Sequence, residues 1–299
     1  MRRSTPSLLT SAVLATLLPL TLSACASSSP AMTADAAAQA AGPGMGVSAR
    51  APDPLLDTVL AGSWRSRDNV ARDQYRHPRE TLSFFGIAAD QAIVEISPGG
   101  GWYTEILAPY VRDAGQYVGA VVDPAALPAG RARENAEKGR AATQARFAGA
   151  PAQYRGATLV SYDPGAPRFG APASADAVLT FRNVHNWRMS GQAEGMFNGF
   201  FEVLKPGGVL GVVEHRADAD VPSDDSTGYV SEAQVIALAQ AAGFRLDARS
   251  EANANPRDTK DHPNGVWTLP PAKRHDAEDA QKYLAIGESD RMTLRFVKP

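Results

Sequence analysis

The segment between Glu95 and Trp102 has the composition of a ligand-binding turn, with three consecutive glycines after a proline. It follows the apolar run 92–94 and precedes the helix-like run 103–108, which gives the order strand, glycine-rich turn, helix. Glycine is used where a side chain would block a ligand or where φ must be positive. Because nucleotide-like ligands bind beyond the carboxyl ends of the strands in open α/β sheets, this turn predicts a ligand with a ribose or adenine portion.

Every second residue after the acid Glu95 is small, at Ser97, Gly99 and Gly101. The dinucleotide-binding pattern G-x-G-x-x-G fits Gly99 and Gly101, but Thr104 occupies its third glycine and would hinder close helix–strand packing. The pattern instead resembles the first motif of class I S-adenosylmethionine-dependent methyltransferases, acid-x-G-x-G-x-G, with serine at the first glycine. That resemblance implies that Glu95, Ser97, Gly99 and Gly101 bind the cofactor S-adenosylmethionine. An ordinary tight turn between strand and helix is the alternative.

Two acids end the next two predicted strands. Asp123 ends the apolar segment that starts at Gln116, and a carboxylate there can accept hydrogen bonds from both ribose hydroxyls. Asp163 ends a weaker strand that starts at Thr158, after a polar stretch, 130–150, that predicts one added helix. The resemblance assigns Asp123 to the ribose and Asp163 to the adenine amino group. Both acids precede a proline, so strand-end Asp-Pro turns are the alternative.

A polar and aromatic tip follows the predicted fourth strand and contains Asn183, His185 and Trp187. Methyl transfer needs a base when the attacking atom carries a proton to lose, and we expect His185 to be this base. Asn183 is assigned to the cofactor and Trp187 to the substrate pocket. Glu214 and His215, after the predicted fifth strand, are the other candidate bases. The alternative is that His185 only caps a turn or a helix.

A segment before the first strand, 72–85, is expected to close one side of the site. In the resembled family the helix at this place often covers the donor, so Tyr75, Arg76 and His77 are candidate pocket residues. Tyr103, directly after the glycine turn, is assigned to the substrate pocket as well. A packing helix with solvent-facing arginines is the alternative for residues 72–85.

A second segment, 262–271, combines proline, glycine and Trp267 in a long connection before the last strand. That composition fits a lid or substrate loop, and Trp267 is assigned to the substrate pocket. The alternative is that Trp267 is a hydrophobic anchor.

The remaining elements predict the fold. The run 204–210 resembles the late helix-turn-strand motif of the same family, and 231–242 predicts a helix with a capping box. Residues 244–250 and 291–297 predict two further strands, the last with period-2 alternation. The resemblance implies a Rossmann-like α/β fold, with a mostly parallel seven-stranded sheet, an antiparallel last strand and helices on both faces. Residues 55–299 are expected to form one domain.

The N-terminus resembles a bacterial lipoprotein signal peptide. Arg2-Arg3 is basic, residues 8–22 are apolar but too short for a stable membrane span, and Leu22-Ser-Ala-Cys25 resembles a lipobox. We therefore expect residues 1–24 to be removed and Cys25, the single cysteine of the chain, to carry lipid. Residues 25–54 are rich in Ala, Ser, Gly and Pro and predict a flexible tether. The expected location is the cell envelope, on the periplasmic face, with the outer membrane favoured.

Charge and residue counts exclude several classes of function. The formal net charge is −2 and no basic block lies outside the signal, which argues against a nucleic-acid partner. The five histidines are scattered without a metal-ligand spacing, so no metal is expected. The sequence has no G-x-S-x-G elbow of a hydrolase.

These observations predict S-adenosylmethionine-dependent methyl transfer to a small molecule by an exported, lipid-anchored enzyme. The chain resembles a group of predicted bacterial methyltransferases. One alternative is a binding module in the cell envelope that keeps the methyltransferase fold without catalysis. A nicotinamide-dependent oxidoreductase is the other, and Thr104 and the alternating last strand argue against it.

Overall fold

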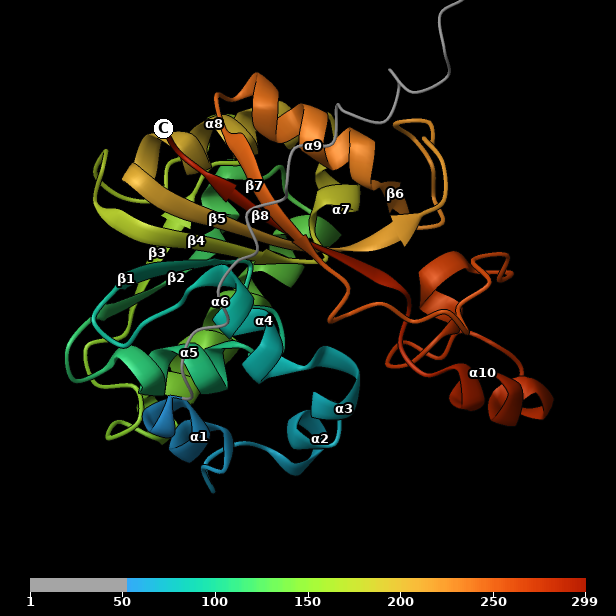
Figure 1. The fold of residues 1–299 in the computed structure, drawn as a ribbon, viewed down its shortest axis with the longest axis horizontal. Coiled ribbons are helices and arrows are strands. Elements are labelled where there is room, and N and C mark those ends of the chain that lie inside the picture. Colours follow the sequence, from blue (N-terminus) through green and yellow to red (C-terminus); the bar gives the residue numbers. More distant parts are fainter. Residues whose placement is uncertain (1–52) are drawn as a thin grey trace, which may run out of the picture. The chain divides into compact units, whose positions relative to one another are not determined.

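A mostly parallel sheet organises the part of the chain that the structure, a computed structural model, describes, residues 53–299 (Figure 1). The spatial order is β3-β2-β1-β4-β5-β8-β7. The first five strands of this order pair in parallel, and β8 is antiparallel to both β5 and β7. The strands are β1 (Ala92–Ile96), β2 (Gln116–Val122), β3 (Thr158–Tyr162), β4 (Ala175–Phe181), β5 (Leu204–Ala217), β7 (Arg245–Ser250) and β8 (Arg291–Val297).

The predicted fold is confirmed, with one short strand added. A two-residue strand, β6 (Val230–Ser231), pairs with the end of β5 beside the seven predicted strands. The chain leaves β1 toward β2 on one side and later enters β4 on the other, so a topological switch point lies between β1 and β4. Ligands of open α/β sheets bind at such a point, beyond the carboxyl ends of the strands.

Helices cover both faces of the sheet, because the central strands bury side chains on both sides. Ile93 and Leu179 point into one hydrophobic cluster, whereas Val94 and Val178 point into the other, as the period of two requires. The first cluster includes residues of α1 (Pro54–Leu60), α4 (Pro78–Phe85) and α5 (Thr104–Val111), and the second includes residues of α7 (Val184–Met189), α8 (Ala193–Val203) and α9 (Glu232–Ala241).

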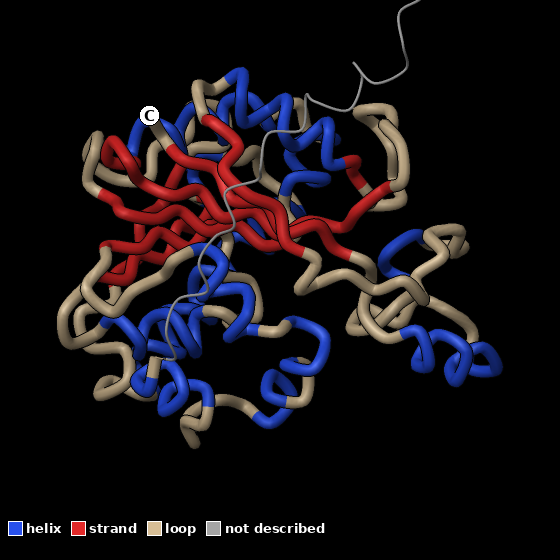
Figure 2. Tube along the Cα trace, in the orientation of Figure 1, coloured by secondary structure: helices blue, strands red, loops and turns tan. Residues whose placement is uncertain are grey.

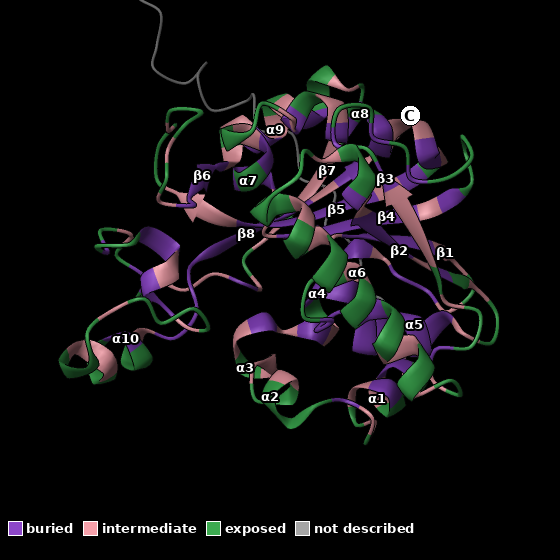
Figure 3. Cartoon of the chain, turned by 180° about the vertical axis from the view of Figure 1, so that it is seen from behind, coloured by how far each residue is buried: buried purple, intermediate pink, exposed green. Residues whose placement is uncertain are grey.

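The long helix α6 (Arg131–Gly149) confirms the helix expected between the second and third strands. Only Thr143 is buried among its residues, whereas every residue of α5 is buried (Figure 3). The predicted capping box of α9 is also present, between Ser231 and Gln234.

The junction between α8 and β5 lies at the start of the run 204–210, where a helix-turn-strand motif is expected. Helix α8 ends at Val203, and β5 already begins at Leu204 and contains Pro206–Gly208. A residue before proline is disfavoured in the α region, so Lys205 leaves the helix and extends the strand instead.

Two irregular segments lie at the carboxyl edge of the sheet. The first contains α2 (Arg67–Val70) and α3 (Asp73–Arg76), and His77 connects α3 to α4 with φ of 39°. The second is the insertion 251–290 between β7 and β8, which is mostly loop (Figure 2). It contains η2 (Gly265–Thr268), η3 (Ala277–Asp279) and α10 (Ala280–Ile286); the remaining short helix, η1 (Pro124–Ala126), follows β2.

Helix α1 begins at Pro54, where the Asp53 side chain accepts hydrogen bonds from the N–H groups of Leu55 and Leu56. The predicted signal peptide, Cys25 and the tether up to residue 52 lie outside the described residues. Among the helices in residues 53–299, none has the length and apolar character needed to cross a bilayer.

Candidate functional site

Bare backbone of the glycine turn faces open space. A side-chain carbon at Gly100 would meet no atom within 4 Å, and one at Gly99 would meet only the Ser97 carbonyl, at 3.8 Å. Gly101, in contrast, lies under Arg146, where such a carbon would be 2.2 Å from Nη1. The structure therefore places Gly99 and Gly100 at a cavity and uses Gly101 for close packing. The predicted alternation of small residues did not include Gly100.

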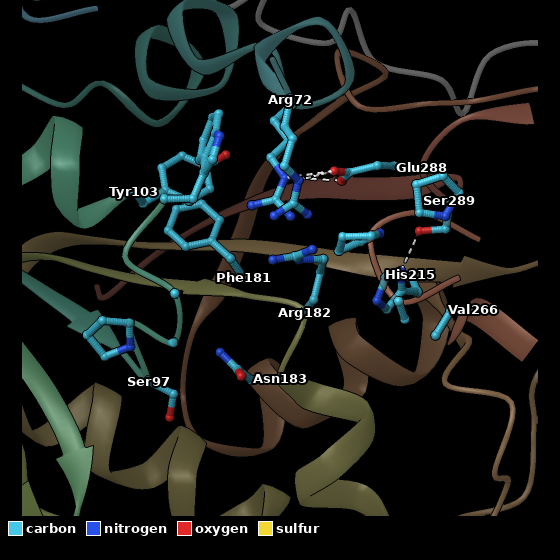
Figure 4. A pocket seen from close by; sticks show the side chains of 18 of the residues that line it. Arg72, Ser97, Tyr103, Phe181, Arg182, Asn183, His215, Val266, Glu288 and Ser289 are labelled. Carbon is cyan, nitrogen blue, oxygen red and sulfur yellow. Dashed lines mark hydrogen bonds and ion pairs between the residues drawn. The ribbon is translucent and has the colours of Figure 1, made fainter. Parts of the chain in front are cut away.

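Two cavities of about 340 Å³ each meet at this turn and share Ser97, Pro98 and Gly99. We call the one beside the end of β2 the apolar cavity, since Val121, Val122 and Leu127 line it with the inner face of α6. The other, the polar cavity, lies at the ends of β1 and β4. Its walls include Glu95, Tyr103, Phe181, Asn183, His185, His215, Trp267 and three arginines, at positions 72, 76 and 182 (Figure 4).

The two predicted strand-end acids do not line either cavity. Oδ1 of Asp123 accepts a hydrogen bond from the N–H of Ala125 at 3.0 Å, and Oδ1 of Asp163 accepts one from Gly165 at 2.8 Å. Both carboxylates thus close local turns, as their proline neighbours allow. Asp123 still follows Val122, a wall residue of the apolar cavity, whereas Asp163 is exposed.

Glu95 is buried beneath the glycine turn and lines the polar cavity. Its Oε2 accepts hydrogen bonds from the Tyr117 hydroxyl at 2.5 Å and the Thr104 hydroxyl at 2.8 Å. Burial raises the pKa of this carboxyl to about 7, against the two hydrogen bonds, which lower the pKa. Thr104, at the position where the dinucleotide pattern has glycine, therefore serves Glu95 as a hydrogen-bond donor.

Ser97 has φ of 52°, a left-handed conformation that favours glycine. The resembled motif has glycine at this place, and the backbone keeps the glycine-like geometry in spite of the side chain. The Ser97 hydroxyl lies 3.3 Å from the Tyr162 hydroxyl at the end of β3.

His185 lies in the first turn of α7 and is held by Glu214 of β5. Its Nδ1 is 3.0 Å from Oε1 of Glu214, whose two oxygens also accept hydrogen bonds from the N–H groups of Val184, His185 and His215. A carboxylate at Nδ1 fixes the proton there and leaves Nε2 with its lone pair. The structure thus brings the two predicted base candidates His185 and Glu214 together, with Glu214 as the partner of His185.

His215, the third base candidate, is 2.5 Å from the Ser289 hydroxyl through Nδ1. Burial first, and then repulsion from Arg182 and from His185 when its ring is protonated, hold the pKa of His215 well below the ordinary value. Among the described residues, His185, Glu214 and His215 form a group whose ligand atoms lie within 4.8 Å of one another, as in a metal site. The oxygens of Glu214 already accept four N–H groups, and a cavity lined by arginines opposes a further cation.

Aromatic rings form the side walls of the polar cavity. Tyr103 stacks on Phe181 with ring centroids 3.4 Å apart, and Trp267 meets His185 edge to face at 5.9 Å. Trp187, which was assigned to the substrate pocket, lies in the hydrophobic core against Phe200 instead. Trp187 lies three residues after the core residue Val184, so helical spacing directs it into the same core, and it does not line the polar cavity.

The helical segment before β1 lines the polar cavity with residues that differ in part from those that the sequence indicated. Tyr75 and His77 line a separate cavity of about 260 Å³, whereas Arg72 and Arg76 line the polar one. The sequence indicates Arg76 as a candidate pocket residue, together with Tyr75 and His77, but it does not indicate Arg72 or Arg182. The four-residue spacing relates Arg72 to Arg76 but does not by itself show that either arginine faces the cavity.

Asn183 occupies the position expected for a cofactor contact, at the tip of β4. Its side-chain amide donates hydrogen bonds to the Ile96 carbonyl at 3.2 Å and to the Thr180 hydroxyl at 3.1 Å. These bonds tie the end of β4 to the end of β1 and hold the two edges of the cavity together.

Comparison with known proteins shows the fold. No protein-family profile matches the chain, and no curated protein is similar to it in sequence. A SAM-dependent methyltransferase from Aquifex aeolicus is similar in structure, with 13% identity and a TM-score of 0.51, covering 82% of this chain and 98% of its own. The [4+2]-cyclase SpnF is similar as well, with 19% identity and a TM-score of 0.50, covering 82% and 92%. The described residues therefore have the Rossmann-like fold of class I methyltransferases.

Glu95 predicts a specific pH dependence of stability. The folded protein holds a proton on Glu95 between pH 4.5 and about 7 that the unfolded chain releases, so this group lowers the free energy of unfolding as pH rises. We expect wild type to lose about 2 to 3 kcal/mol of its free energy of unfolding, relative to Glu95→Gln, from about pH 5 to about pH 8. Urea unfolding at both pH values measures it. Glu134→Gln, on the exposed side of α6, is the control, and an equal difference at both pH values would contradict the prediction.

Proposed function

We propose that this protein transfers a methyl group from S-adenosylmethionine to a small molecule. The observation that carries the proposal is the meeting of two cavities at the turn Ser97–Gly99, one apolar and one with a base candidate. The fold supports it, since the cavities lie at the switch point between β1 and β4 where this architecture binds ligands.

The residues present fit such a cofactor. Val121, Val122 and Leu127 offer an apolar slot for an adenine ring, and the missing side chains at Gly99 and Gly100 leave room for the chain that links ribose and methionine. Glu95 and Asn183 line the polar cavity. When bound, the cofactor supplies an electrophilic methyl group on a sulfonium sulfur.

His185 is proposed to take the proton of the acceptor. Nε2 of His185 would accept the proton that the acceptor loses on methylation, while Nδ1–H would stay hydrogen-bonded to Glu214. The Glu214 carboxylate stabilises the imidazolium that results. The stacked rings of Tyr103 and Phe181 and the edge of Trp267 line the polar cavity together with His185.

A second candidate is a binding module that keeps the fold without methyl transfer. The turns closed by Asp123 and Asp163 favour it, since neither carboxylate lines the apolar cavity. The titration below separates the two candidates, because a module for another ligand would bind neither S-adenosylmethionine nor its product. A nicotinamide cofactor is opposed by Thr104, whose hydroxyl is committed to Glu95.

Export and lipid anchoring at Cys25 are proposed from the sequence alone, on the basic Arg2-Arg3, the apolar run 8–22 and the lipobox-like Leu22-Ser-Ala-Cys25. We place the protein in the cell envelope, on the periplasmic face and by preference at the outer membrane. Radioactive palmitate should label the wild-type chain expressed in a bacterium and should not label Cys25→Ser. Equal labelling of both chains would contradict the anchor.

Calorimetric titration of the full chain with S-adenosylmethionine, S-adenosylhomocysteine and NAD tests the cofactor. We expect micromolar binding of the first two and none of NAD. Gly100→Leu should weaken binding by about 100-fold or more, because its side chain would enter the space left open beside the turn. Gly149→Leu, at another glycine with no atom within 4 Å of the new carbon, is the matched control. Wild-type protein that binds neither compound would overturn the proposal.

Loss of the His185 imidazole should slow transfer without affecting cofactor binding. With labelled S-adenosylmethionine and a small-molecule extract of bacterial cells as acceptor source, we expect His185→Gln to reduce labelled product formation by about 10²- to 10⁴-fold. Its dissociation constant for S-adenosylhomocysteine should stay at the wild-type value. His275→Gln, outside the cavity, serves as control, and an unchanged rate in His185→Gln would exclude the assigned role.

A further inference from the structure

Four arginines surround a single carboxylate at one end of the polar cavity. Arg72 and Arg76 come from the segment before β1, Arg182 follows β4, and Arg291 begins β8; the carboxylate is that of Glu288 in the insertion. Oε1 of Glu288 accepts a hydrogen bond from Nε of Arg72 at 2.7 Å, and Oε2 accepts from Arg76 at 3.1 Å and Arg291 at 3.0 Å. One negative charge thus faces four positive ones.

Several guanidinium groups of this cluster have donors that no described residue accepts. Nη2 of Arg72 and Nη2 of Arg76 are buried without a hydrogen-bond partner, and Arg76 as a whole is 3% exposed. The side chain of Arg182 forms no hydrogen bond or ion pair with any residue in 53–299. In contrast, each of the three guanidinium nitrogens of Arg291 donates a hydrogen bond, to Glu288, the Ser289 carbonyl and the Tyr75 carbonyl.

This arrangement is costly unless an anion completes it. Burial and the nearby charges of Arg182, Arg72 and Arg291 lower the pKa of Arg76 to about 8, although Glu288 opposes the effect. Burial likewise lowers the pKa of Arg182 to about 10. Arg182 also has φ of 62°, a left-handed conformation that is unfavourable for a residue with a side chain. Buried, uncompensated charge of this kind is typical of a binding site.

We infer that Arg72, Arg76 and Arg182 bind an oxyanion, a carboxylate or phosphate group, that the small-molecule acceptor carries. The planar fork of arginine matches two oxygens of either group. That the anion belongs to a methyl acceptor rests on the proposed function, whereas the anion site itself does not. The acceptor would then be an acid, with its anionic group held at Arg182 and its nucleophile toward the neighbouring His185.

The position of the cluster favours the acceptor over the cofactor as the source of the anion. Figure 4 shows the Arg72–Glu288 pair and Ser97 at opposite sides of the cavity, with Arg182 and Asn183 between them. The methionine part of the cofactor carries an ammonium beside its carboxylate and a sulfonium as well, so it brings no net negative charge to this surplus of arginines. An anionic acceptor supplies that charge.

Anion binding by the full chain tests the site directly. We will compare the melting temperature in sodium phosphate, sodium acetate and sodium chloride at equal ionic strength. Phosphate near 100 times its dissociation constant should raise the melting temperature by about 5 °C over chloride. Arg182→Gln should lose this shift, and Arg188→Gln, which lies on α7 outside the cavity, should keep it. The general stabilisation by phosphate acts on all variants alike and cancels in this comparison.

The outcome that overturns the site is an equal shift in wild type and Arg182→Gln. Because Arg182 has no partner to lose, this variant should melt in chloride no lower than wild type, and a large drop would also contradict the assignment. Titration with S-adenosylmethionine and with 5′-methylthioadenosine, which lacks the carboxylate, identifies the source of the anion.

If Arg182→Gln binds S-adenosylmethionine within about threefold of wild type, the acceptor is supported as the source. A loss of about 30-fold or more for S-adenosylmethionine, with unchanged binding of 5′-methylthioadenosine, would assign the arginines to the cofactor and overturn the inference. Phosphate binding by a wild-type chain that binds no S-adenosylmethionine would support the anion site and refute the proposed function.

Discussion

The buried carboxylate of Glu214 holds the candidate site together. It lies inside β5 and accepts the N–H groups of Val184, His185 and His215 as well as the His185 side chain. Two neighbouring strand ends, those of β4 and β5, are thereby fixed to one point. A buried carboxylate is stable only when donors surround it, so the turn after β4 must keep this shape. The same turn sets the positions of Arg182, Asn183 and His185.

The cavity that results is lined by aromatic rings and is rich in positive charge. Such a space favours a negative ligand and disfavours a free cation. A cationic methyl donor and an anionic acceptor would balance each other there. Glu288, in the insertion 251–290, forms ion pairs with Arg72 and Arg76 and lies just before the start of β8. The insertion and the segment before β1 are therefore linked, and both form walls of the cavity.

The strands could be predicted from the sequence because each central strand is a short apolar run that ends in a turn. Strands β1 and β4 bury side chains on both faces, which parallel strands require. The antiparallel arrangement of the last strand, which pairs with β5, was implied by the family resemblance and not by its alternation. The glycine turn indicated the place of the site for the same local reason, since glycine is needed where backbone faces a ligand.

Side-chain directions in the site could not be predicted, because they depend on contacts between distant segments. Gly101 packs under Arg146 of α6, which no local pattern indicates. Helix α3 has only four residues and ends at His77 in a left-handed conformation, so helical periodicity does not say whether Tyr75 or Arg76 faces the cavity. Asp163 satisfies its own turn, a competition with ligand binding that strand-end position alone does not reveal.

A crystal structure of the full chain with S-adenosylhomocysteine is the most direct measurement. The adenosine is expected in the apolar cavity beside Val121 and Val122, with the homocysteine passing Gly99 and Gly100 toward Asn183. Adenosine bound in the polar cavity, or anywhere other than at the glycine turn, would contradict the assignment of the two cavities.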